Sequence, residues 1–180
     1  MKIFVGCGSR SGKSPRYTAV AREFGEFIAK YGHDLVYGGC ARGVMGTLQS
    51  TVAKEPKSDI YIVTCNAYYE DIKELPYREA YSYPTVNERK NKFIELSDLL
   101  VYLPGGVGTD DEFSSALEAK KNGEHNLPMI VFNIEGSFEP RQAVLERAVE
   151  DNFVDSNIFD LFHVVSDMDE FKKVFFALDF

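Results

Sequence analysis

Short apolar runs alternate with longer amphipathic segments along the whole chain. The runs are rich in valine, isoleucine, leucine and aromatic residues, a composition that is typical of strands buried on both faces of a sheet. They predict strands at residues 2–6, 34–37, 59–64, 98–103, 128–132 and 161–165.

The segments between these runs carry apolar residues three or four positions apart, as in a helix that packs one face on a core. The first helix has clear end signals, since Ser14 suits the N-cap, Pro15 the first position and Gly32 the position past the end. Residues 65–84, with five tyrosines, show neither pattern and are expected to be irregular. Helices are predicted at residues 15–31, 42–54, 85–97, 109–122, 140–150 and 167–178.

Strands that alternate with helices predict right-handed βαβ units, and therefore an α/β fold with a doubly wound parallel sheet between two layers of helices. The 180 residues suit one domain, and no repeat, linker or low-complexity segment divides residues 1–180. Sheets of this kind bind ligands outside the carboxyl ends of their strands. The glycine-rich loops of this chain follow the strands at that edge.

Composition limits the classes of partner and the cellular location that we expect for this protein. The net charge of −8 argues against nucleic-acid binding, which needs a basic face. No apolar run approaches the roughly 18 residues that a membrane span needs, and the first run is too short for a signal peptide. The cysteines, Cys7, Cys40 and Cys65, are odd in number and form no Cys-x-x-Cys pair. We therefore expect a cytoplasmic protein with reduced thiols, no metal site and no membrane or nucleic-acid partner.

Three glycine-rich loops follow predicted strands, with the sequences GCGSRSGKS at residues 6–14, GGCARGVMG at 38–46 and PGGVGTDDE at 104–112. Glycines let successive backbone N–H groups converge on an anion at a helix N-terminus. The first loop is no P-loop, because Cys7 replaces the first glycine and Pro15 directly follows Gly-Lys-Ser. A nicotinamide dinucleotide is a less favoured alternative, since the loop fits a longer dinucleotide fingerprint but no acidic residue ends the next strand.

Two charged motifs each have a structural and a chemical explanation. Thr109 and Glu112 match a capping box, and periodicity alone favours that structural role for Glu112. Arg89 and Lys90 lie early in another predicted helix, where the helix dipole gives no reason for cations. They either border an anionic ligand or belong to a solvated charged face.

The order of these motifs resembles the Lonely Guy (LOG) family of nucleoside 5′-monophosphate phosphoribohydrolases, for which lysine decarboxylase is an older misnomer. Residues 104–112 fit the family pattern PGGxGTxxE, and Glu88-Arg89-Lys90 precedes it. Residues 8–15, 36–39 and 43–46 are similar to the N-terminal half of the family. The resemblance covers nearly the whole chain in order.

The resemblance implies a Rossmann-like homodimer that hydrolyses the N-glycosidic bond of a nucleoside 5′-monophosphate, such as a cytokinin riboside monophosphate or AMP. The products would be a free base and ribose 5-phosphate, and no cofactor is expected. The catalytic pair would be Arg89 and Glu112. The substrate and its phosphate would be bound by Ser9, Gly39, Glu70, Lys90, Gly105, Gly106, Gly108 and Thr109.

The chain also departs from the family pattern. Residues 86–90 lack the usual Met and His, Phe93 replaces a second Met, Cys40 replaces a glycine, and the tyrosine-rich residues 65–84 replace an apolar segment. The preferred base is therefore open, and the tyrosines either stack on it, line a dimer interface or pack as an ordinary loop. Two other function classes remain: a nucleotide or cofactor carrier without turnover, and a decarboxylase with pyridoxal phosphate on a lysine, for which nothing marks Lys13 or Lys90.

Overall fold

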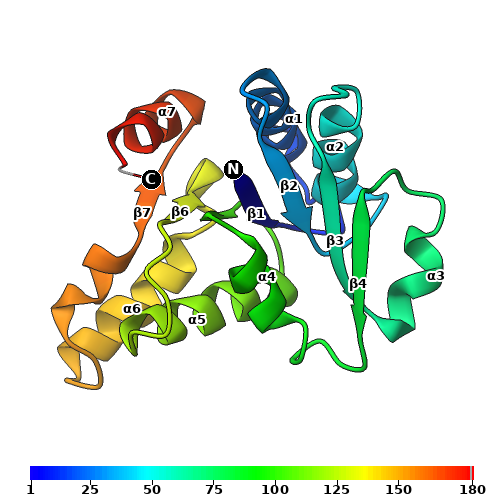
Figure 1. Cartoon of the computed structure of the whole chain (residues 1–180). Coiled ribbons are helices and arrows are strands. Elements are labelled where there is room, and N and C mark those ends of the chain that lie inside the picture. The colour runs from blue at the N-terminus through cyan, green and yellow to red at the C-terminus, as the bar shows by residue number, and fades with distance from the viewer. Residues whose placement is uncertain (179) are drawn as a thin grey trace.

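The computed structural model describes residues 1–178 and 180. Within these residues seven strands form one parallel sheet in the order β4-β3-β2-β1-β5-β6-β7, which confirms the predicted α/β class (Figure 1). The strands are β1 (Lys2–Gly6), β2 (Asp34–Tyr37), β3 (Ile60–Cys65), β4 (Glu79–Tyr83), β5 (Leu99–Tyr102), β6 (Met129–Phe132) and β7 (His163–Val165).

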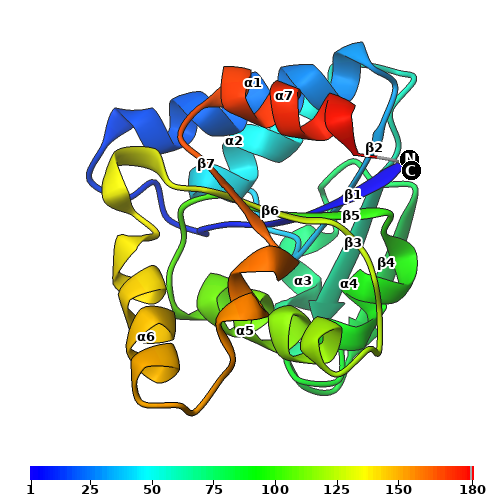
Figure 2. The ribbon, with the colours of Figure 1, turned by 90° about the vertical axis from the view of Figure 1, so that its left-hand side faces the viewer.

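Helices cover both faces of the sheet. Figure 2 shows the sheet nearly edge-on, with α1, α2 and α7 along one face and α4, α5 and α6 along the other. No helix among the described residues is both long and apolar enough to cross a bilayer. The helices are α1 (Pro15–Lys30), α2 (Gly43–Val52), α3 (Tyr69–Ile72), α4 (Lys90–Leu96), α5 (Val107–Lys121), α6 (Glu139–Glu150) and α7 (Met168–Ala177).

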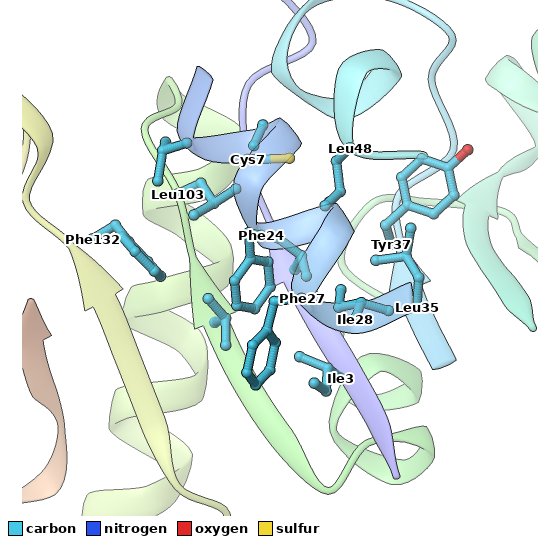
Figure 3. Close-up of a cluster of buried hydrophobic side chains, with 14 of the residues drawn as sticks. Ile3, Cys7, Phe24, Phe27, Ile28, Leu35, Tyr37, Leu48, Leu103 and Phe132 are labelled. Atoms are coloured by element: carbon cyan, nitrogen blue, oxygen red, sulfur yellow. The ribbon is translucent and has the colours of Figure 1, made fainter. Parts of the chain in front are cut away.

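The core consists of two apolar clusters, one on each face of the sheet. Because successive side chains of a strand point to opposite faces, Ile3 and Val5 belong to the cluster beneath α1, α2 and α7, whereas Phe4 belongs to the other. In the first cluster Phe24 of α1 packs edge-on against Phe132 of β6, at 5.7 Å between ring centroids (Figure 3). Burial on both faces explains the near-continuous apolar runs in the sequence.

The end signals of the first helix are confirmed. The Ser14 hydroxyl accepts a hydrogen bond from the Arg16 N–H at 3.1 Å, and Pro15 is the first helical residue. Past the C-cap, Gly32 has a φ of +64°, a conformation that glycine adopts without strain.

The structure differs from the expected elements between residues 65 and 90. Within the segment expected to be irregular, β4 pairs with β3 over its whole length, and the short α3 precedes it. The strand was missed because it lies at the sheet edge and is only half-buried, so it has no apolar run. The helix expected from residue 85 begins at Lys90, since residues 85–88 form a hydrogen-bonded turn instead.

The strand order creates one natural place for a ligand. From β1 the chain builds β2, β3 and β4 on one side and β5, β6 and β7 on the other. The connections after β1 and β5 therefore leave the sheet toward opposite faces, which opens a crevice at the carboxyl ends of these neighbouring strands.

Candidate active site

The three glycine-rich loops meet at this crevice, as the sequence predicts. The Met45 N–H donates to the Gly8 carbonyl at 3.0 Å, and the Gly8 N–H donates to the Pro104 carbonyl at 3.1 Å. Gly43 has a φ of +65°, and a Cβ there would lie 2.5 Å from the backbone of Arg10. Only glycine allows so close an approach of two backbones.

An open cavity of about 1720 Å³ lies over these loops. It brings together eight of the ten site residues that the sequence predicts, from four different connections of the sheet. The residues in its wall are Ser9, Gly39, Arg89, Gly105, Gly106, Gly108, Thr109 and Glu112.

One end of the cavity is the N-terminus of α5, which we call the anion cup (residues 105–109). Gly106 is the N-cap residue, and no side chain among the described residues caps this helix end. The N–H groups of the first helical turn therefore lack intrahelical partners. Cβ positions on Gly106 and Gly108 point into open space, whereas a Cβ on Gly105 would overlap the Thr109 hydroxyl. Unpaired N–H groups and the positive end of the helix dipole make the cup suited to a phosphate.

The capping-box interpretation of Glu112 is wrong. Because α5 begins at Val107, Thr109 is its third residue and not its N-cap. The Glu112 side chain lies in the cavity wall, where Oε1 accepts a hydrogen bond from Nη2 of Arg89 at 3.0 Å. The helix begins two residues before the expected start because Gly106 is its N-cap, so Val107 and Gly108 precede Thr109 in the first turn.

Glu112 is a buried carboxyl group with one strong partner. Glu112 is 7% exposed. Burial raises the pKa of its carboxyl group to about 7; the nearby Arg89 opposes this increase and Asp111 adds to it. A Cβ on Gly6 would lie 3.2 Å from Oε2, so the glycine makes room for the carboxyl group. A carboxyl group of this kind changes its charge near neutral pH, as catalytic carboxyl groups often do.

The Arg89 side chain packs on an aromatic ring and binds Glu112 through only one of its three nitrogens. Its guanidinium lies 5.4 Å over the ring of the buried Phe93. The Nε atom is buried and has no hydrogen-bond partner among the described residues. The Nη1 atom lies 3.6 Å from the Cβ position of Gly38 at the end of β2. The arginine thus connects the α5 side of the cavity to the β2 side and keeps donor capacity for a ligand.

Two predicted site residues lie outside the cavity wall. Lys90 donates to Asp111 Oδ1 at 2.8 Å and to Ser115 Oγ at 2.9 Å, so it ties α4 to α5. Glu70 is largely exposed and pairs with Lys73 at 2.8 Å. Their contacts with a substrate stay predictions.

The cavity wall also contains charged residues that the sequence does not single out, namely Arg10, Arg42, Asp71, Glu118, Lys121 and Arg141. Arg10 and Arg42 lie inside the glycine-rich loops and could have been selected on that ground. Arg141 comes from α6, donates to the Ser137 carbonyl at 3.1 Å and pairs with Asp110 in the first turn of α5. No sequence pattern connects α6 to the cup, so only the fold reveals this contact.

No free lysine amine for pyridoxal phosphate lies in the described cavity wall. The lysine in the wall, Lys121, pairs with Glu118 at 2.6 Å, the Lys90 amine is occupied as described above, and Lys13 is not a wall residue. Within the described residues no group of three or more His, Cys, Asp or Glu side chains is arranged for a metal ion.

Comparison with known proteins identifies relatives over most of the chain. Residues 45–174 match a family model described as "Possible lysine decarboxylase". The chain is 31% identical over 162 residues to the probable cytokinin riboside 5′-monophosphate phosphoribohydrolase LOG4 of Oryza sativa subsp. japonica, covering 88% of this chain and 70% of the relative. It is 29% identical to LOG of the same plant, covering 85% of this chain and 63% of the relative. Identity to LOG1 of Arabidopsis thaliana is also 29%, covering 85% of this chain and 72% of the relative.

Solved structures share the fold at lower identity. The molybdenum cofactor binding protein from Rippkaea orientalis superposes with a TM-score of 0.69 at 20% identity, over 98% of this chain and 95% of that protein. The Moco carrier protein from Chlamydomonas reinhardtii gives 0.69 at 21%, over 98% of both chains. The structural likeness establishes the Rossmann-like fold, and the family match and the identity of 31% show that this chain belongs to the LOG family.

Proposed function

We propose that this protein hydrolyses the N-glycosidic bond of a nucleoside 5′-monophosphate to give the free base and ribose 5-phosphate. The observation that carries the proposal is the ion pair between the partly buried Arg89 and the buried Glu112, which lies in the wall of the same cavity as the anion cup. A carrier needs a cup for an anion but no such pair of side chains beside it. The curated names of relatives at about 30% identity support the same reaction.

The pair suits the chemistry of a ribosyl C–N bond. Cleavage develops positive charge on C1′ and the ring oxygen, as in glycoside hydrolysis. Ionised Glu112 would stabilise that charge and orient the attacking water, and its burial strengthens the electrostatic effect. Arg89 would hold the carboxylate in place through Nη2 and offer Nη1, on the side of Gly38, to the departing base.

The cup would supply binding energy at a distance from the reacting bond. A 5′-phosphate held by the backbone of residues 105–109 fixes the ribose relative to Glu112, and such remote binding raises turnover as well as affinity. Arg141 supports the proposal because it neutralises Asp110, whose charge would otherwise repel a phosphate at the first turn of α5.

The test is product analysis with a panel of nucleoside monophosphates and their matching nucleosides. We expect free base and ribose 5-phosphate from at least one monophosphate, and turnover at least about 100-fold slower on the corresponding nucleoside. Equal rates on AMP and adenosine would contradict the role of the cup. No product from any monophosphate, combined with tight binding of one of them, would favour the carrier.

We also propose that the active form is a homodimer. Three strongly exposed apolar side chains, Val107, Val144 and Phe153, line the same cavity, which is larger than one nucleotide requires. A second copy seated along α5 and α6 would cover them and leave the nucleotide site enclosed. Sedimentation should show a dimer for the natural chain and a shift toward monomer for Val144→Asp. A monomeric natural chain with full activity would overturn this proposal.

A further inference from the structure

The strand order separates the two ends of the cavity. The anion cup follows β5, Gly38 follows β2, and Tyr68 and Asp71 follow β3. With strands about 4.8 Å apart, β3 lies three spacings or roughly 14 Å from β5. Arg89, in contact with Glu112 on one side and near Gly38 on the other, lies between these ends. A nucleotide with its phosphate in the cup and C1′ at Glu112 therefore extends its base toward β3.

The short segment after β3 is firmly attached to the site. Ile72 of α3 is fully buried, and its Cγ2 atom lies 2.8 Å from the Cβ position of Gly39. Gly39 has a φ of +80° and no room for a side chain, so α3 packs directly on the second glycine-rich loop. The position of α3 is thus fixed by a core residue rather than by surface contacts.

Helical spacing divides this segment into two sides. Tyr68 and Asp71, three positions apart, line the cavity beside the buried Ile72. Glu70 and Lys73 pair with each other on the other side and are not in the cavity wall. The cavity side therefore offers one aromatic ring, which is 51% exposed, and one carboxylate to a ligand.

These two groups have a definite chemical preference. An exposed tyrosine ring stacks on any nucleobase and does not discriminate strongly. An ionised carboxylate only accepts hydrogen bonds, so it favours a base edge with an N–H donor and disfavours a carbonyl oxygen at the same place. Adenine and cytosine carry an exocyclic amino group, and N6-monoalkylated adenine keeps one N–H, whereas hypoxanthine and uracil present a carbonyl.

We infer that Tyr68 and Asp71 form the base subsite of this protein, with Asp71 selecting nucleobases that have an exocyclic N–H. The inference rests on the proposed function for the direction in which the nucleotide lies. It names a specificity that depends on the tyrosine-rich segment and not on the glycine-rich loops.

The experiment measures binding rather than turnover, so that its result is independent of catalysis. Calorimetry with the Glu112→Gln protein compares AMP with IMP and CMP with UMP. We expect each amino nucleotide to bind at least about tenfold more tightly than its oxo partner. N6-methyl-AMP should bind like AMP, and N6,N6-dimethyl-AMP, which has no N–H, should bind like IMP.

Variants identify the residue responsible. Asp71→Asn replaces the acceptor with a group that also donates, so the preference for AMP over IMP should shrink to about threefold or reverse. Glu74→Gln removes the same charge from the same exposed segment outside the cavity wall and should keep the full preference. Equal binding of AMP and IMP, or an unchanged preference in a folded Asp71→Asn protein, would overturn the inference. Hydrolysis without base preference would overturn only the inference, whereas failure of every monophosphate to bind or react would overturn the proposed function as well.

Discussion

The two ends of the cavity are built from different parts of the chain. The anion cup consists of backbone N–H groups, and its geometry requires glycine at fixed positions. The base end consists of side chains on, and just before, a short helix that one buried isoleucine anchors. We therefore expect a Cβ at Gly105 to impair the cup equally for substrates with any base. At the base end, we expect single side-chain substitutions to change the preference for one base over another. Glu112 and Arg89 lie where the two ends meet.

The largest expected effect on stability concerns Glu112, where the two ends of the cavity meet. Burial raises the pKa of Glu112 from 4.5 to about 7, so the folded chain holds one more proton than the unfolded chain between these values. The corresponding stability is present below pH 4.5 and lost as the pH rises to 7, by about 3 kcal/mol. Glu112→Gln lacks this dependence. The difference in free energy of unfolding, variant minus natural chain, should rise by about 3 kcal/mol from pH 4 to pH 8, measured by urea denaturation. A flat difference would mean an ordinary carboxyl group.

The next prediction concerns the addition of a methyl group to a glycine of the anion cup. The Cβ of Gly105→Ala would overlap the Thr109 hydroxyl, whereas that of Gly106→Ala would point into open space. A displacement of about 1 Å in a positioning loop costs roughly 100-fold, so kcat/KM for AMP should fall by about that factor in Gly105→Ala and by much less in Gly106→Ala. The loss should be the same for every base. Steady-state kinetics on several monophosphates tests this, and a base-dependent loss would break the separation of the two ends.

Removal of one ring from the base end should have the smallest effect. Tyr68→Ala loses stacking on the base, which should raise KM by about tenfold and leave kcat nearly unchanged. Tyr69→Ala removes an equally large ring from the neighbouring position, outside the cavity wall, and serves as the control. Similar KM values for the two variants would place the base elsewhere.

The same contrast explains what the sequence predicts. Apolar runs predict every strand except β4. Five of them, β1, β2, β3, β5 and β6, are almost entirely buried, whereas the edge strand β7 is partly exposed and is found from its short apolar run. Glycine-rich loops predict the cup, because the residue type itself reports a backbone requirement. The start of α5 lies two residues before the expected position, because Thr109 and Glu112 have the spacing of a capping box. The N-cap at Gly106 and the contact of Glu112 with Arg89 show that this pattern is coincidental.

The base end left little signal in the sequence. An edge strand that is half-buried lacks a clean alternation, and a helix of one turn is too short to show a periodic pattern. Asp71 and Arg141 line the cavity because the fold brings together segments that are distant in the sequence. Such residues belong to no local motif, so they are found only from the structure.

The most direct test of the account is turnover of AMP or the best monophosphate by Glu112→Gln, with the thermal midpoint measured at pH 5. At that pH the carboxyl group of Glu112 is protonated in the folded protein, so glutamine is a close match in charge and size. We predict an unchanged midpoint and a kcat lower by about 100- to 1,000-fold near pH 8, the usual loss for one preorganised electrostatic group. Full activity, or a loss of activity explained by unfolding, would contradict a catalytic role for Glu112.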